Sequence, residues 1–188
     1  MLKRICAFLL VLFLPITAFA APISVSAQSA IVINSADNSV IYSKNAYSSM
    51  PMASTTKIMT CVLACESTRL NDAVVITNEM LAGTEGSLIY LKPDDKITLY
   101  DLAVAAMLAS GNDAANAVAF CLSGSIADFV ALMNKKARSI GMKNTFFVTP
   151  SGLDEKNHHS TAYDMALLAS YAMKNSCFSE ICTLKSAQ

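Results

Sequence analysis

The sequence contains no tryptophan and no excess of charge of either sign, since 14 Lys and Arg residues oppose 14 Asp and Glu residues over 188 positions. No run of basic residues occurs along the chain. Because nucleic acids and anionic membranes are captured largely by clustered positive charge, this balance argues against a nucleic-acid partner. The partner expected from charge is small or neutral.

Glycine and proline are scarce as well, with 6 and 5 residues. These numbers are too low for a fibrous or disordered protein, and a hydrophobic content of 54% provides for a sizeable core. No internal repeat, linker or low-complexity tract divides the chain. We therefore expect residues 21–188 to form one globular unit of mixed α and β structure.

The first twenty residues have the pattern of a signal peptide. Lys3 and Arg4 precede an uncharged apolar run at 5–14, and the small residues Ala18 and Ala20 follow it. The run is shorter than the about 20 residues of a membrane-spanning helix. We predict a signal peptide at 1–20, with an uncleaved anchor as the alternative. The mature protein is then expected in the periplasm or cell wall, and membrane association of a longer parent protein is left open.

Loss of the leader would remove Cys6 and leave five cysteines, Cys61, Cys65, Cys121, Cys177 and Cys182. An exported protein can form disulfides, but an odd number of cysteines cannot all pair within one chain. The spacings include no CxxC pair and no metal-ligand pattern. We expect the cysteines to be small buried thiols, and we expect no metal site.

Hydrophobic periodicity and capping residues predict the order of the elements. Strands are expected at 27–34, 40–42, 74–76 and 88–91, the first two joined by a turn at Asp37 and Asn38. Helices are expected from near Ser54 to 64, and at 98–109, 125–140 and 161–175. The pattern indicates a strand-rich N-terminal edge and a helical centre.

Ser54 and Lys57 are three residues apart at the start of a predicted helix. On a helix this spacing places both side chains on one face, where a lysine amine can deprotonate a serine hydroxyl. A pair at this spacing is expected about once by chance in such a chain, so the spacing is unspecific. The alternative is a helix-capping serine followed by a solvated lysine, whereas catalysis requires a lysine that is buried enough to be neutral.

Ser110 and Asn112 flank Gly111 directly after the apolar helix predicted at 98–109. They place a hydroxyl and a carboxamide where this helix ends against the core. The same spacing occurs at Ser43 and Asn45, so it too is unspecific. The alternative is an ordinary C-terminal turn rich in glycine and asparagine.

Together, the motifs Ser54-Thr55-Thr56-Lys57 and Ser110-Gly111-Asn112 resemble the first two motifs of the serine penicillin-recognising enzymes, specifically the D-alanyl-D-alanine carboxypeptidases of peptidase family S11. The resemblance covers about residues 27–174 and includes the stretches 90–93, 133–147 and 152–164. It implies a β-lactamase/DD-peptidase-like fold, with an antiparallel sheet packed against helices and a largely helical subdomain.

The resemblance also implies an activity, the removal of the terminal D-alanine from peptidoglycan stem peptides through an acyl-enzyme. Ser54 would be the nucleophile and Lys57 the base, Ser110 would relay the proton to the leaving amine, and Asn112 would hold the substrate amide and orient the lysine. β-Lactam antibiotics would be covalent inhibitors. No metal or cofactor is required.

One part of the family pattern is missing from the sequence. The third motif, Lys-Thr-Gly on a later strand, is absent, and the nearest match, Lys185-Ser186-Ala187, lacks the glycine. We therefore expect residues 21–188 to be the N-terminal portion of an S11 catalytic domain without its C-terminal strands. Loss of an oxyanion-hole donor alone typically costs about 10²- to 10³-fold in rate, so activity of this chain is expected to be impaired.

The sequence also bears on three alternative functions. A class A β-lactamase needs a Glu-x-x-Leu-Asn loop after the second motif, but the nearest sequence, 66–71, has one residue more and precedes Ser110. The lack of a GxSxG motif argues against a Ser-His-Asp hydrolase, and the adjacent His158 and His159 make a poor metal pair. A non-catalytic paralogue that binds wall peptides is the remaining alternative.

Overall fold

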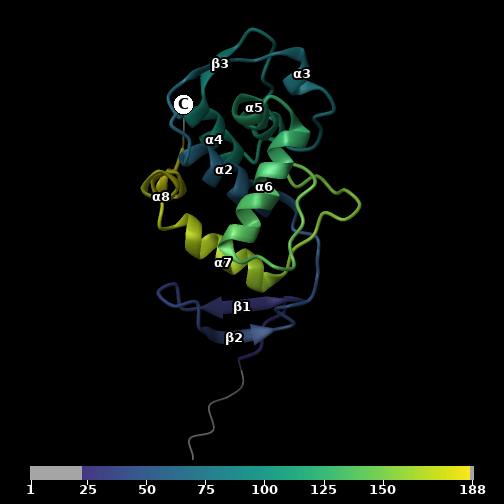
Figure 1. Ribbon diagram of the computed structural model, residues 1–188, viewed down its shortest axis with the longest axis vertical. Coiled ribbons are helices and arrows are strands. Elements are labelled where there is room, and N and C mark those ends of the chain that lie inside the picture. The colour runs from purple at the N-terminus through teal and green to yellow at the C-terminus, as the bar shows by residue number, and fades with distance from the viewer. Residues whose placement is uncertain (1–22, 187–188) are drawn as a thin grey trace, which may run out of the picture.

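Two small antiparallel sheets and a group of helices make up residues 23–186, the part of the chain that this computed structural model describes (Figure 1). The predicted signal peptide at 1–20 lies outside the described residues. The strands are β1 (Ala30–Ile33), β2 (Val40–Lys44), β3 (Ala73–Val75) and β4 (Lys96–Thr98). The helices are η3 (Ala53–Thr56), α2 (Lys57–Cys65), α3 (Asn78–Leu81), α4 (Leu99–Leu108), α5 (Asn112–Ser123), α6 (Ile126–Ile140), α7 (Ala162–Ala172) and α8 (Ser176–Thr183).

The N-terminal hairpin forms as the sequence predicts. β1 and β2 pair antiparallel, and at the turn Asp37 accepts a hydrogen bond from the backbone N–H of Ser39 at 2.9 Å. Asn38 takes a positive φ of 60°, a conformation that asparagine tolerates better than most residues. β1 packs against α7, so the hairpin closes one end of the helical group (Figure 1).

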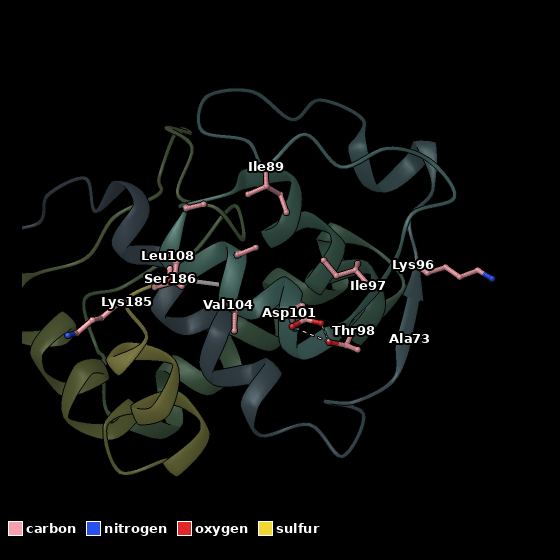
Figure 2. Close-up of a pocket in the computed structure, with 12 residues that line it drawn as sticks. Ala73, Ile89, Lys96, Ile97, Thr98, Asp101, Val104, Leu108, Lys185 and Ser186 are labelled. Carbon is pink, nitrogen blue, oxygen red and sulfur yellow. Dashed lines mark hydrogen bonds between the residues drawn. The ribbon is translucent and has the colours of Figure 1, made fainter. Parts of the chain in front are cut away.

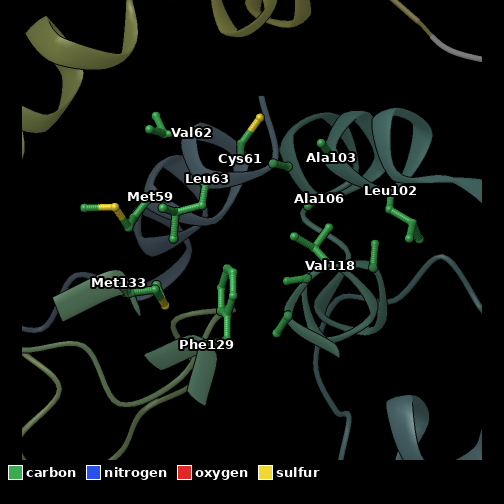
Figure 3. Packing of buried hydrophobic residues seen from close by; sticks show 14 of the residues in the cluster. Met59, Cys61, Val62, Leu63, Leu102, Ala103, Ala106, Val118, Phe129 and Met133 are labelled. Atoms are coloured by element: carbon green, nitrogen blue, oxygen red, sulfur yellow. The ribbon is translucent and has the colours of Figure 1, made fainter. Parts of the chain in front are cut away.

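Helix α2 lies at the centre of the core, in contact with α4, α5, α6, α7 and α8 (Figure 1). Its residues from Met59 to Ala64 are buried around the whole helix, as expected for a helix that is apolar on every side. Figure 3 shows these side chains meeting those of the neighbouring helices, among them Leu102 and Ala103 of α4, Val118 of α5 and Phe129 and Met133 of α6. The core therefore fixes the helix that carries Lys57.

The starts of three long helices are confirmed by their caps. The hydroxyls of Thr98, Ser125 and Thr161 accept hydrogen bonds from the backbone N–H groups of Asp101, Asp128 and Asp164. α6 ends at Gly141, which has a φ of 94°. These caps set the register of α4, α6 and α7.

The strand predicted at 88–91 is wrong, since that segment is irregular and β3 pairs instead with β4. The backbone N–H groups of Ile89 and Leu91 donate to the carboxylate of Asp113, each at 3.1 Å. A side chain thus satisfies the donors that a neighbouring strand would otherwise bond. Helices α3, α5 and α8 were not predicted.

We expect Gly152→Ala to destabilise the fold strongly. Gly152 has a φ of 85°, and a Cβ at this position would overlap the backbone carbonyl of Ala53, the residue before Ser54. The control is Gly83→Ala, because Gly83 has a similar φ of 67° but no atom within 4 Å of an added Cβ. Denaturant unfolding should show a loss of about 1 kcal/mol for Gly83→Ala and about 3 kcal/mol for Gly152→Ala. Equal losses would contradict the close approach.

Candidate active site

Ser54 and Lys57 lie on either side of the junction between η3 and α2. Ser54 is exposed on the 3₁₀ turn, whereas the Lys57 side chain is only 1% exposed. Lys57 Nζ donates a hydrogen bond to Ser54 Oγ at 3.2 Å. The preceding residue, Ala53, has a φ of 43°, a strained conformation for a residue with a side chain. The alternative of a capping serine with a solvated lysine is therefore wrong.

Ser110 reaches the same point from the connection between α4 and α5. Its Oγ lies 2.9 Å from Ser54 Oγ and 3.3 Å from Lys57 Nζ. Ser110 has a φ of 56°, again in the sparsely populated left-handed region. Two segments more than fifty residues apart in sequence thus bring two hydroxyls and one amine together, as the motifs predict.

The third partner of Lys57 is a backbone group. Nζ donates to the carbonyl oxygen of Ser151 at 2.8 Å. Within residues 23–186, the amine therefore donates to three neutral oxygens, two from hydroxyls and one from a carbonyl. Burial without an ionic partner disfavours the charged form and lowers the pKa of Lys57 to about 8. A substantial fraction of this lysine is neutral near physiological pH.

A buried histidine holds the loop that carries Ser151. His158 Nδ1 accepts from the backbone N–H of Val148 at 2.9 Å, and Nε2 lies 2.8 Å from Thr56 Oγ1. Burial lowers the pKa of His158, so the ring is neutral and its Nε2–H donates to Thr56. Both histidines lie in the loop expected for them, but no local pattern predicts that His158 is buried against Thr56, the residue before Lys57.

Asn112 begins α5 on the far side of Ser110. Its Nδ2 donates to the carbonyl oxygen of Glu85 at 2.6 Å, and its side chain is mostly buried. Within residues 23–186 no hydrogen bond joins it to Lys57, so the predicted orientation of the lysine by Asn112 has no direct contact to support it. Asn112 does line a cavity of about 150 Å³, together with Thr149, Ser151 and Leu153.

A larger hollow of about 700 Å³ is lined by other residues, among them Ala109, which directly precedes Ser110 (Figure 2). It is bordered by Ile97 of β4, by Val104 and Leu108 of α4, and by Lys185 and Ser186 near the end of the described chain. The Asp101 carboxylate in this hollow is already bonded to the Thr98 hydroxyl at 2.6 Å. This contact belongs to the cap of α4, because Thr98 is the residue at which that helix starts.

In the described part of the chain, no three His, Cys, Asp or Glu side chains come close enough together to hold a metal ion. Over the same residues, no single helix is both long and apolar enough to cross a bilayer, although α5 and α6 taken together across an 85° bend meet that criterion.

Comparison with known proteins agrees with this geometry. The family model for D-alanyl-D-alanine carboxypeptidases of peptidase family S11 matches residues 16–188. The chain is 42% identical to the D-alanyl-D-alanine carboxypeptidase DacF of Bacillus subtilis, with 79% of this chain and 39% of DacF covered. It is 39% identical to DacC of Escherichia coli, covering 85% of this chain and 43% of DacC.

Solved structures show the same relationship. A D-alanyl-D-alanine carboxypeptidase from Mycobacterium tuberculosis superimposes with a TM-score of 0.84 at 33% identity, over 90% of this chain and 65% of that one. Penicillin-binding protein 6B from Escherichia coli gives a TM-score of 0.84 at 27% identity, over 92% of this chain and 58% of that one. These matches confirm the predicted DD-peptidase-like fold.

The chain spans about two fifths of the length of the curated relatives it matches. Over that length it carries the match of the family model, the fold of the solved relatives and the meeting of the Ser54, Lys57 and Ser110 side chains. The chain belongs to the peptidase S11 family of D-alanyl-D-alanine carboxypeptidases.

Proposed function

We propose that this chain provides the nucleophile and the base of a serine-type D-Ala-D-Ala carboxypeptidase acting on peptidoglycan stem peptides. The observation that carries the proposal is the buried Lys57 amine, which lies within hydrogen-bond distance of both Ser54 and Ser110. A neutral amine in this position has one lone pair that can take the proton of Ser54, whose hydroxyl is exposed to an incoming substrate. Family membership and the names of the relatives give the substrate class.

In the proposed acylation step, neutral Lys57 takes the proton from Ser54 as Oγ attacks the penultimate carbonyl carbon of the stem peptide. The amine keeps its hydrogen bond to the Ser151 carbonyl, which holds its direction while the charge on nitrogen grows. The Ser110 hydroxyl, 3.3 Å from Lys57 Nζ, then donates its own proton to the departing amine of D-alanine and takes the proton held by Lys57 in exchange. Water then hydrolyses the ester at Ser54 and regenerates the enzyme.

β-Lactams are proposed to acylate Ser54 by the same step, because their strained amide presents a carbonyl to the same nucleophile. Asn112 and the small cavity beside Ser151 are proposed to receive the substrate amide. Glu85 and Glu155 also line this cavity. We further propose, from residues 1–20, that the protein is exported and acts in the periplasm or cell wall.

The alternatives receive less support. A class A β-lactamase requires a glutamate that activates the deacylating water, but Glu66, in the sequence nearest to that motif, is bound to Lys136 at 2.6 Å and to the Tyr171 hydroxyl at 2.5 Å. A protein that only binds wall peptides has no need of a buried, neutral lysine, since burying an amine costs stability. The experiments below separate catalysis from binding.

We expect Ser54→Ala to abolish covalent labelling by a fluorescent penicillin, because no other described hydroxyl is placed to be activated by both Lys57 and Ser110. Ser49→Ala is the matched control, as Ser49 is exposed a few residues upstream. Labelling would be measured on denaturing gels, with circular dichroism to establish that each variant is folded. A folded wild-type chain that never labels would favour the binding-only alternative.

We expect the rate of penicillin labelling to rise with pH. Since the pKa of Lys57 is lowered to about 8, the neutral fraction grows about tenfold per pH unit below that value and levels off about one unit above it. Rates measured at constant ionic strength from about pH 6 to 10 should follow this curve. Lys57→Arg should remove the rise, because arginine does not deprotonate in this range. A flat profile in the wild-type chain would argue against Lys57 as the base.

A further inference from the structure

Two cysteines from distant parts of the chain touch at the end of α2 that is remote from the catalytic groups. Cys65 is the last residue of α2, and Cys177 lies in the first turn of α8. Their Sγ atoms are 2.8 Å apart. For comparison, Cys61 and Cys65, one turn apart on the same helix, have Sγ atoms separated by 4.0 Å. The pair from different helices is therefore much the closer of the two.

The packing around α8 explains why these sulfur atoms face each other. Phe178 and Ile181 of α8 are buried in the core, and the Asn175 side chain caps the helix by accepting from the N–H of Phe178 at 3.1 Å. These contacts fix the rotation of α8 so that Cys177 points at α2. Both sulfur-bearing residues are only partly buried.

Metal binding is not the explanation for this cluster. Cys61, Cys65 and Cys177 lie together, yet within residues 23–186 no set of three potential ligands has the geometry to hold a metal ion. Among the residues that the structure describes, neither thiol has a positively charged partner that would mark it as a reactive thiolate. The remaining reaction open to two adjacent thiols is oxidation to a disulfide.

We propose that Cys65 and Cys177 form a disulfide that joins α2 to α8. Two S–H bonds are lost and one S–S bond is made, while the two electrons and two protons pass to a disulfide-bearing oxidant, which is reduced to two thiols. The export proposed from residues 1–20 would bring the chain to a compartment where such oxidants act. Cys61, Cys121 and Cys182 stay reduced, which accounts for the odd number of cysteines.

In the folded protein, burial raises the pKa of Cys177 to about 12, and the adjacent Cys61 together with burial raises the pKa of Cys65. Since only the thiolate attacks a disulfide, the folded pair reacts slowly at neutral pH. The same burial hinders reductants once the bond exists.

The cross-link encloses both other segments of the candidate active site. Cys65 and Cys177 are 112 positions apart, and the loop that they close contains Ser110 and Ser151. Closing a loop of this length restricts the unfolded chain strongly, so the bond stabilises the arrangement in which these segments meet Lys57.

The test uses the full chain produced with export to an oxidising compartment, with free thiols alkylated in denaturant at the moment of lysis. Trypsin cleavage after Lys57, Arg69, Lys174 and Lys185 should yield peptides 58–69 and 175–185 joined by a bond that reductant breaks. Fragmentation of the linked pair in the wild-type chain should place the bond at Cys65 and Cys177, and three of the five cysteines should be alkylated.

Serine variants supply the matched controls. Cys65→Ser and Cys177→Ser should each abolish the linked peptide, whereas Cys61→Ser and Cys182→Ser, on the same two peptides, should retain it. Reduction of the wild-type chain should lower its Tm by roughly 5–15 °C and leave the Tm of Cys177→Ser unchanged. Full alkylation of the wild-type chain, or a bond located at Cys61 or Cys182, would overturn the proposal.

Discussion

The burial of one amine without an acidic partner is the constraint on which the rest of the site depends. An ammonium group loses its hydration when it is buried, and Lys57 regains only part of it from three neutral oxygens. A carboxylate in the same place would hold the proton on nitrogen and end its use as a base. The fold therefore has to deliver polar atoms that position the amine without holding its pKa at the ordinary value of a lysine.

The polar atoms around Lys57 come from three segments of the chain. The packing of the core determines where these segments meet. α2 is surrounded by other helices, so the position of Lys57 at its first residue is fixed from all sides. The α4–α5 connection and the loop after Pro150 then supply Ser110 and Ser151. Thr60, one turn along α2 from Thr56, donates to the carbonyl of Pro150 at 2.6 Å and ties this loop to the helix a second time.

Local signals in the sequence predicted local structure well. The caps at Thr98, Ser125 and Thr161 are governed by contacts within four residues, and the structure confirms each of them. The 88–91 segment was wrongly predicted as a strand because its apolar residues suit one, while the Asp113 carboxylate that bonds its backbone lies more than twenty positions away. Hydrophobic periodicity within a short segment carries no information about a hydrogen-bond partner so far away in the sequence.

The residues of the candidate site likewise fall into two groups, those that sequence motifs reveal and those that only the folded structure reveals. Ser54, Lys57 and Ser110 were found because side chains of those types form motifs, and the structure brings their polar atoms together. The roles assigned to them, and to Asn112, are still predictions. Ser151 was missed, since any residue offers a carbonyl, and His158 was missed because its burial depends on the packing of the whole loop.

The acceptor that Ser151 offers to Lys57 is a main-chain carbonyl oxygen, which a change of side chain does not remove. Exchanging Ser151 for another small residue such as alanine leaves the carbonyl oxygen in place, so the substitution does not remove the contact with Lys57. The importance of the contact would surface instead at neighbours that set the path of the backbone, such as Gly152. In this protein, a map of sensitive positions would outline the supports of the lysine rather than the atom it touches.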